Sequence, residues 1–277
     1  MDFYQLIQRR KSVRVYGKKP VDIERLNDLM DEAEEIKGII SQIDTQFVLI
    51  ENGWEQEEKL QGKIGYDGNV VRAPHYIVLL CAPKEGYLQN AGYMMEQMVL
   101  KTIEYELSTC WLTINHGGHE VKDLLGIQEA GIPVAMIALG YGQEGDVEAG
   151  KKEDNDKLSL QDFVYDQRWG RAPWLEEIKM RGLATVFSHI GNAPSFRNRQ
   201  PWKLIIDGDE IILTVGHKTQ EDGYLLIDAG IMMIYMERSF NEEGLMAKWS
   251  LYMEALDGIY EAYGIPEYQK IIGTLHI

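Results

Sequence analysis

The sequence predicts an α+β protein in which one folding pattern occurs twice along a single chain. Short apolar strand segments alternate with helices in both halves, and each half contains one helix that is apolar almost all round. These two helices also match each other, because Asn90-Ala91-Gly92 aligns with Asp228-Ala229-Gly230 at an offset of 138 positions. With 277 residues, of which 45% are hydrophobic, the chain is long enough for one large domain or two modest ones.

The first half is predicted to contain helices and strands in mixed order. Phe3, Leu6 and Ile7 have helical spacing, and Asp22 is a suitable N-cap for a second helix. The run 75–81 is apolar without interruption, so we expect a strand that is buried on both faces. The predicted helices cover 2–10, 22–37 and 91–107, the predicted strands cover 46–51, 75–81 and 132–139, and 52–70 is predicted to be a loop or a mobile helix.

An acidic segment with glycines and no periodicity, residues 143–157, is interpreted as a linker between the halves. We therefore predict an N-terminal half over 1–157 and a C-terminal half over 158–277. Asp207-Gly208-Asp209-Glu210 suits a tight hairpin between two strands of the C-terminal half. The predicted elements of this half are helices over 174–187 and 225–240 and strands over 202–206 and 211–215.

The similarity of the two apolar helices extends beyond their first residues. At the offset of 138, the aligned pairs are Met94 and Met232, Met95 and Met233, Leu107 and Leu245, and Trp111 and Trp249. Any two buried helices resemble each other to some degree, but a shared Ala-Gly beginning and a shared Leu-x-x-x-Trp ending favour a duplication. We expect two copies of one fold packed about an internal pseudo-two-fold axis, with each central helix covering the other.

The chain is acidic, with 28 Lys and Arg against 44 Asp and Glu and a formal net charge of -16. Such a field repels polyanions, which argues against nucleic acid and anionic membranes as partners, although a small anionic ligand can bind where cations gather. No apolar stretch is long enough to span a bilayer, and the first residues do not resemble a secretory signal. Two cysteines make no disulfide framework, so we expect a cytoplasmic protein with reduced thiols.

Cations gather in Arg9-Arg10-Lys11-Ser12-Val13-Arg14, which follows the first predicted helix. Guanidinium forks beside a hydroxyl are the groups that bind a phosphate. A solvated basic surface is an equally good interpretation of this segment taken alone.

A second polar cluster, 192–202, lies between a predicted helix and a predicted strand. Its sequence, Asn192-Ala193-Pro194-Ser195-Phe196-Arg197-Asn198-Arg199-Gln200-Pro201-Trp202, is rich in amide and guanidinium groups. The two prolines restrict the backbone, so we expect a stiff loop that positions a ligand well. An ordinary helix-to-strand turn is the alternative interpretation.

Two other features invite a chemical role. His116 and His119 are spaced i, i+3, but no carboxylate or cysteine pattern supplies further metal ligands, so we interpret them as loop histidines. Cys110 is either a reactive thiol or, more simply, an inert core cysteine at the end of a buried helix.

Four segments together resemble the nitroreductase family. Arg9–Arg14 is similar to its R-R-x-S-x-R segment, and Pro194–Trp202 is similar to its P-S-x-x-N-x-Q-P-W loop. Ser108-Thr109-Cys110-Trp111 resembles its G-L-G-T-C-W helix end, and Leu124-Leu125-Gly126-Ile127 with 132–142 resembles its L-L-G-I-P … A-L-G-Y segment. The resemblance implies a three-layer α/β/α sandwich and covers most of 3–170 and much of 174–252.

The sequence departs from the family pattern in an informative way. Ordinary nitroreductase chains carry both motifs, whereas 37–46 lacks the amide loop and the region 169–174 lacks the arginine segment. The halves are therefore complementary, which resembles the Thermotoga-type subfamily with two fused, pseudo-dimeric halves. The resemblance implies one complete flavin site per chain, in a monomer or a weak homodimer.

The resemblance also implies an FMN-dependent oxidoreductase with NAD(P)H as a transient reductant and a small electron-poor acceptor such as a nitroaromatic or a quinone. A non-catalytic flavin-binding protein with a degenerate acceptor pocket is the alternative. No side-chain acid or base is obligatory in this chemistry, so no catalytic residue is assigned. The residues that the resemblance assigns to FMN are Arg9, Arg10, Ser12, Arg14, Gly117, Gly118, Lys157, Pro194, Ser195, Asn198 and Gln200.

Overall fold

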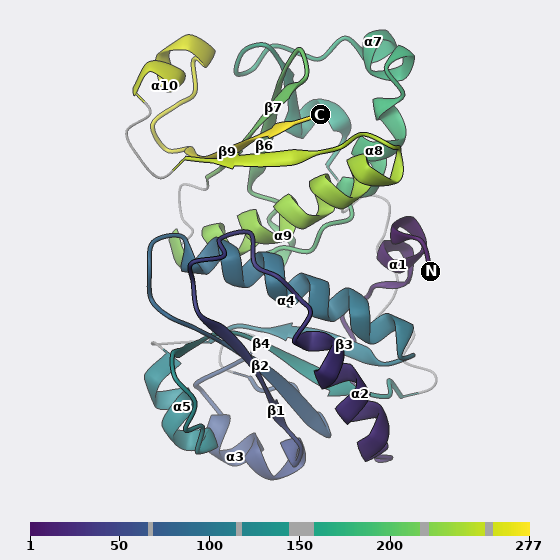
Figure 1. Ribbon diagram of the computed structural model, residues 1–277, viewed down its shortest axis with the longest axis vertical. Helices are drawn as coiled ribbons and strands as arrows, with labels where there is room; N and C mark the ends of the chain where they lie inside the picture. Colours follow the sequence, from purple (N-terminus) through teal and green to yellow (C-terminus); the bar gives the residue numbers. More distant parts are fainter. Residues whose placement is uncertain (66–68, 115–117, 144–157, 217–221, 253–256) are drawn as a thin grey trace. The chain divides into compact units, whose positions relative to one another are not determined.

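The computed structural model describes residues 1–277 except 66–68, 115–117, 144–157, 217–221 and 253–256 (Figure 1). The chain divides into two compact units. The N-terminal unit is Arg9–Lys151, and the C-terminal unit combines Lys152–Ile277 with the first eight residues, Met1–Gln8. Residues 144–157, which form most of the predicted linker, are outside the described part of the chain.

The N-terminal unit is built on a four-stranded antiparallel sheet with the strand order β1-β2-β4-β3. Helices lie on both faces of this sheet, as Figure 1 shows, so that the unit has three layers. Its strands are β1 (Thr45–Ile50), β2 (His75–Cys81), β3 (Ser108–Leu112) and β4 (Ile132–Gly140). Its helices are α2 (Ile23–Ala33), η1 (Gly53–Gln56), α3 (Glu57–Leu60), α4 (Tyr87–Glu104) and α5 (Gly118–Leu125).

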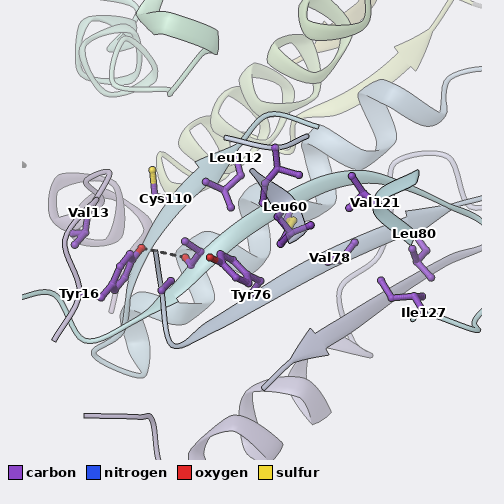
Figure 2. Packing of buried hydrophobic residues seen from close by; sticks show 14 residues of the cluster. Val13, Tyr16, Leu60, Tyr76, Val78, Leu80, Cys110, Leu112, Val121 and Ile127 are labelled. Atoms are coloured by element: carbon purple, nitrogen blue, oxygen red, sulfur yellow. Dashed lines mark hydrogen bonds between the residues drawn. The ribbon is translucent and has the colours of Figure 1, made fainter. Parts of the chain in front are cut away.

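Strand β2 is the centre of this unit, and all seven of its residues are buried. Because side chains alternate along a strand, Tyr76, Val78 and Leu80 share one face and pack in the cluster drawn in Figure 2. In the same cluster the Tyr16 hydroxyl donates a hydrogen bond to the main-chain oxygen of Ala138 at 3.3 Å. The prediction that 75–81 is a strand buried on both faces is confirmed.

The C-terminal unit contains a five-stranded sheet with the strand order β5-β6-β7-β9-β8, in which only the β5 and β6 pair is parallel. Its strands are β5 (Val164–Asp166), β6 (Trp202–Asp207), β7 (Glu210–Val215), β8 (Lys248–Leu251) and β9 (Lys270–His276). Its helices are α1 (Phe3–Arg9), α6 (Leu160–Phe163), α7 (Leu175–Met180), α8 (Leu183–Ile190), η3 (Phe196–Asn198), α9 (Asp222–Glu242) and α10 (Asp257–Tyr263). Helix α1 is joined to α9, since the Phe3 N–H donates to the Glu242 carboxylate at 2.9 Å.

The duplication predicted from the sequence is visible in the strand register. The order β6-β7-β9-β8 repeats the order β1-β2-β4-β3, with every neighbouring pair antiparallel. Trp111 on β3 pairs with Ile137 on β4, and Trp249 on β8 pairs with Leu275 on β9, so both partners are displaced by the same 138 positions. If the two halves shared only a similar buried helix, the strand pairs that follow the helices would not be expected to have the same register.

The ends of the two long helices repeat at the same offset. After α4 the Leu107 N–H donates to the Thr102 carbonyl at 3.0 Å, and after α9 the Leu245 N–H donates to the Phe240 carbonyl at 3.1 Å. Glu106 and Gly244, the residues before these leucines, both have positive φ. Both ends are thus Schellman motifs, in which a left-handed residue turns the chain toward the next strand.

The loop before the first repeated strand is also shared. Between α2 and β1, and again between α8 and β6, eleven residues connect the helix to the strand. In the N-terminal unit the Ile40 N–H donates to Asn90 Oδ1 at 2.9 Å, and in the C-terminal unit the Phe196 N–H donates to Asp228 Oδ1 at 2.9 Å. Asn90 and Asp228 are both buried, so one polar side chain of each long helix fixes each loop.

The structure corrects several predicted elements. Segment 108–111 is not a helix end but lies in strand β3, because the Schellman turn at Glu106 ends the chain's helical path earlier. The predicted helix 174–187 is two helices, α7 and α8, because Gly182 between them has φ of 72° and interrupts the helical backbone. His119 lies on α5 rather than in a loop.

Asp228 gives a test of the shared loop attachment. We expect Asp228→Ala to lower the free energy of unfolding by about 1–3 kcal/mol, because the Phe196 N–H loses its buried acceptor. Asp228→Asn reproduces Asn90 of the other unit and should cost much less. Urea denaturation followed by circular dichroism measures both, and equal losses for the two variants would contradict this account.

His75 gives a test of pH dependence. Its ring is buried and its Nε2 accepts the Val21 N–H at 3.1 Å, and burial lowers the pKa of His75 below its usual 6.5. The unfolded chain then binds a proton that the folded chain excludes, so this contribution is complete above pH 6.5 and is lost as the pH falls further. We expect the melting temperature of wild type to drop more steeply than that of His75→Gln between pH 7.5 and 5.5; parallel curves would refute this.

Candidate functional site

The arginine segment of the N-terminal unit follows α1 as extended chain along the edge of the sheet. Ser12 forms a parallel bridge with Thr109 of β3, and the Val13 N–H donates to the Thr109 carbonyl at 2.9 Å. Val13 enters the core, and Arg14 is exposed because neighbouring side chains along extended chain point to opposite sides. Lys11 is exposed as well. Arg9, the last residue of α1, is exposed as well.

Arg10 differs from the other cations of this segment because its side chain is only 5% exposed. Its Nε lies 4.0 Å from Oε1 of Glu96, a carboxylate with 0% exposure in the middle of α4. The Arg10 Nε is also buried without a hydrogen-bond partner among the described residues. The guanidinium thus has a charge partner and one donor, the Nε, that the described residues leave unused.

A cavity of about 170 Å³ opens beside Arg10. Its walls carry three cations, two hydroxyl groups, one carboxylate and apolar side chains: Arg9, Arg10, Lys11, Ser108, Thr109, Glu106, Val13, Ile103 and Leu107. Cations outnumber the single carboxylate, and hydroxyl groups can donate to anionic oxygens. This composition suits a small anion with several oxygens, such as a phosphate.

The amide loop of the C-terminal unit is held in a demanding backbone conformation. Arg197, Asn198 and Gln200 have φ of 53°, 54° and 48°. These angles lie in the left-handed region, which residues other than Gly and Asn rarely adopt. The Ser195 hydroxyl accepts the Gln200 N–H at 2.9 Å and thereby closes the loop on itself. Such conformations persist only where the surroundings fix them, and they gather at ligand sites.

The same loop presents an aromatic and cationic surface. Phe196 stacks on Tyr224 of α9 with ring centroids 4.3 Å apart and an interplanar angle of 11°. The guanidinium carbons of Arg197 and Arg199 lie 5.2 and 5.6 Å from the centroid of the Phe196 ring. Within the loop Arg197 and Asn198 are exposed, whereas Gln200 is buried.

The corresponding loop of the N-terminal unit, residues 34–44, has lost these groups. Ile40 and Ile43 are buried there, and a side chain on Gly38 would collide with Asn90. A loop of equal length, attached in the same way, therefore buries two isoleucines and has no arginine or asparagine. This difference agrees with the prediction that the two halves are complementary.

The remaining predicted residues lie apart from these clusters or outside the description. Gly118 begins α5 and is buried, and a Cβ there would collide with the carbonyl oxygen of Pro133 on β4. Close packing of α5 on β4 is thus sufficient to require this glycine. Gly117, His116 and Lys157 lie outside the described residues. Pro194 is half-buried and directly precedes Ser195.

Sequence reasoning did not identify Glu96, Tyr224 or Asp228 as parts of these clusters. The alignment of Asn90 with Asp228 was a usable signal for Asp228, because it marked a polar residue in a buried helix twice. Glu96 has no polar counterpart in the other half, because the residue aligned with it is Ile234. A buried carboxylate that aligns with an isoleucine in the other copy of the repeat is a difference that requires a physical explanation.

Other kinds of site find little support in the described part of the chain. There, no three His, Cys, Asp or Glu side chains gather as metal ligands, and no helix has the length and apolarity to cross a membrane. Cys81 and Cys110 are free and buried, and burial raises the pKa of both thiols, that of Cys81 to about 12. Cys110 is therefore a core cysteine, on β3 instead of a helix end.

Comparisons with known proteins address the fold and the family. A putative nitroreductase from Thermotoga maritima has a similar structure, with a TM-score of 0.62 and 18% identity, covering 100% of this chain and 94% of that chain. A nitroreductase with bound FMN from Bacteroides fragilis gives a TM-score of 0.46 and 22% identity, over 58% of this chain and 99% of that chain. No match was found among the curated proteins.

The family assignment comes from the sequence profile described as "Putative TM nitroreductase", which matches residues 2–239. This match covers most of the chain, including both the arginine segment and the amide loop. The expected resemblance is therefore confirmed, together with the α+β nitroreductase fold and its internal duplication. The chain belongs to the "Putative TM nitroreductase" family.

Proposed function

We propose that this protein is an FMN-dependent oxidoreductase that takes electrons from NAD(P)H and passes them to a small electron-poor acceptor. The observation that carries the proposal is Arg10, a buried side chain whose Nε has no hydrogen-bond partner among the residues that the structure describes, beside a cavity lined by cations and hydroxyls. Family membership supports the same reading, since the arginine segment and the amide loop both fall within the matched residues.

The cofactor assignment follows the two clusters. Arg9, Arg10, Ser12 and Arg14 would hold the phosphate and ribityl chain, because charged donors form the strongest hydrogen bonds to phosphate oxygens. Of these four residues, Arg9 and Arg10 line the cavity, and Ser12 and Arg14 do not. The amide loop would contribute polar groups toward the flavin ring. The residues assigned outside the arginine segment are Gly117, Gly118, Lys157, Pro194, Ser195, Asn198 and Gln200.

FMN, when bound, would supply the redox chemistry by accepting a hydride and delivering electrons to a nitroaromatic or a quinone. The chain's own contribution is binding and electrostatics. Cations such as Arg197 and Arg199 would favour an anionic ligand nearby, and the fixed backbone of the amide loop would present its donors without reorganisation.

A non-catalytic flavin-binding protein is a second candidate, because the loop 34–44 of one half lacks the amide motif and buries two isoleucines. The two candidates differ under anaerobic NAD(P)H. An oxidoreductase loses its yellow colour on addition of the reductant, whereas a non-catalytic binder keeps it.

Flavin content tests the proposal directly. Since one half carries the arginine segment and the other carries the amide loop, we expect one FMN per chain in the purified protein. The measurement is flavin absorbance after denaturation, compared with the chain concentration from amino-acid analysis. Two flavins per chain, or none after incubation with excess FMN, would refute the proposal.

Arg14 tests the phosphate assignment. Arg14→Ala should weaken FMN binding by about 1.5–3 kcal/mol, because it removes a charge-assisted hydrogen bond. Lys18→Ala is the matched control, since it removes one positive charge from an exposed position four residues later. Fluorescence titration of both variants with FMN gives the dissociation constants, and equal values for the two variants would count against Arg14.

A further inference from the structure

Glu96 occupies an unusual place for a carboxylate. It has 0% exposure in the middle of the apolar helix α4, where burial of a charge is costly unless it is paired. The Trp111 indole Nε1–H donates to Oε2 of Glu96 at 2.8 Å, while Oε1 lies 4.0 Å from the Nε of Arg10. One oxygen is thus anchored by the indole, and the other faces the guanidinium.

The second half of the chain is an internal control for this arrangement. At the offset of 138, Ile234 replaces Glu96 and is also buried, and Trp249 replaces Trp111. The Trp249 Nε1–H donates to the main-chain oxygen of Met233 at 3.3 Å instead of to a carboxylate. The fold therefore accepts an isoleucine at this position and satisfies the indole without any charge, so packing alone does not explain Glu96.

The distance between Glu96 and Arg10 indicates how the carboxylate acts on the guanidinium. At 4.0 Å the two charges attract each other, but the separation is too long for a hydrogen bond. The carboxylate therefore holds the guanidinium in place without occupying its Nε donor. Arg10 is also one of the residues that line the cavity, so its guanidinium lies beside the space that an anion would occupy.

We infer that Glu96, anchored by Trp111, is a positioning residue that orients the Arg10 guanidinium toward a phosphate group bound in the adjacent cavity. This inference rests on the proposed function, because the phosphate in question is that of FMN. It predicts that Glu96 affects the recognition of the phosphate and leaves the recognition of the flavin ring unchanged.

Riboflavin separates these two contributions, because it has the same ring and lacks the phosphate. Glu96→Gln keeps the side-chain size and an oxygen acceptor for Trp111 but removes the charge. We expect its dissociation constant for FMN to rise about tenfold, the loss typical of one weakened charge-assisted contact, with that for riboflavin unchanged. The measurement is fluorescence titration of the full-length, flavin-free protein.

Two tryptophan variants give a matched comparison that does not depend on Glu96→Gln folding well. Trp111→Phe removes the anchor of Glu96 and should raise the dissociation constant for FMN without changing that for riboflavin. Trp249→Phe makes the same change in the other unit and should leave both constants at their wild-type values. Equal effects of the two variants on FMN binding would overturn the inference.

Arg10→Gln distinguishes a failure of the inference from a failure of the proposed function. If Arg10→Gln leaves the ratio of FMN to riboflavin affinity unchanged, the phosphate assignment itself is wrong. If Arg10→Gln changes this ratio but Glu96→Gln and Trp111→Phe do not, only the role of Glu96 is wrong. When Arg10 is already replaced, adding Glu96→Gln should have no further effect on the ratio.

Discussion

Each half of the chain depends on one buried polar side chain near the start of its long helix. Asn90 on α4 and Asp228 on α9 each accept a main-chain N–H from the loop that enters the first repeated strand. Because an unpaired N–H in a core is costly, this contact fixes the loop against the helix and sets where the strand begins. The attachment is the same in both halves, but the loops differ in content: one buries Ile40 and Ile43, and the other presents polar groups from a strained backbone.

Periodicity predicted most of the architecture, because buried helices and strands leave strong patterns. The uninterrupted run 75–81 and both long helices lie where the sequence placed them. The errors occurred where conformation depends on a single backbone angle. A helix-ending turn is readable at Gly244 but hidden at Glu106, since glutamate rarely takes a positive φ, and so strand β3 was mistaken for a continuing helix.

The sequence indicated which residue types belong to the candidate site, but not the burial and the neighbours of each side chain. The sequence marked Arg10 and Arg14 alike, yet the Arg10 side chain is buried beside a carboxylate and Arg14 is exposed, because the surroundings of each side chain are set by the tertiary fold. Glu96 is separated from Arg10 by 86 positions, and only the tertiary fold joins them. The internal repeat provides a comparison for Glu96, because the corresponding position of the other long helix is an isoleucine.

Helix α1 has a consequence for how the chain can be divided. Its first residues are fastened to α9 through Phe3 and Tyr4, while the polypeptide from Arg9 onward belongs to the other unit. Proteolysis or gene truncation near residue 151 would therefore not yield two autonomous modules. A fragment starting after that point would lack the aromatic ring that packs against Tyr235 at 5.7 Å, leaving an uncovered apolar surface prone to self-association.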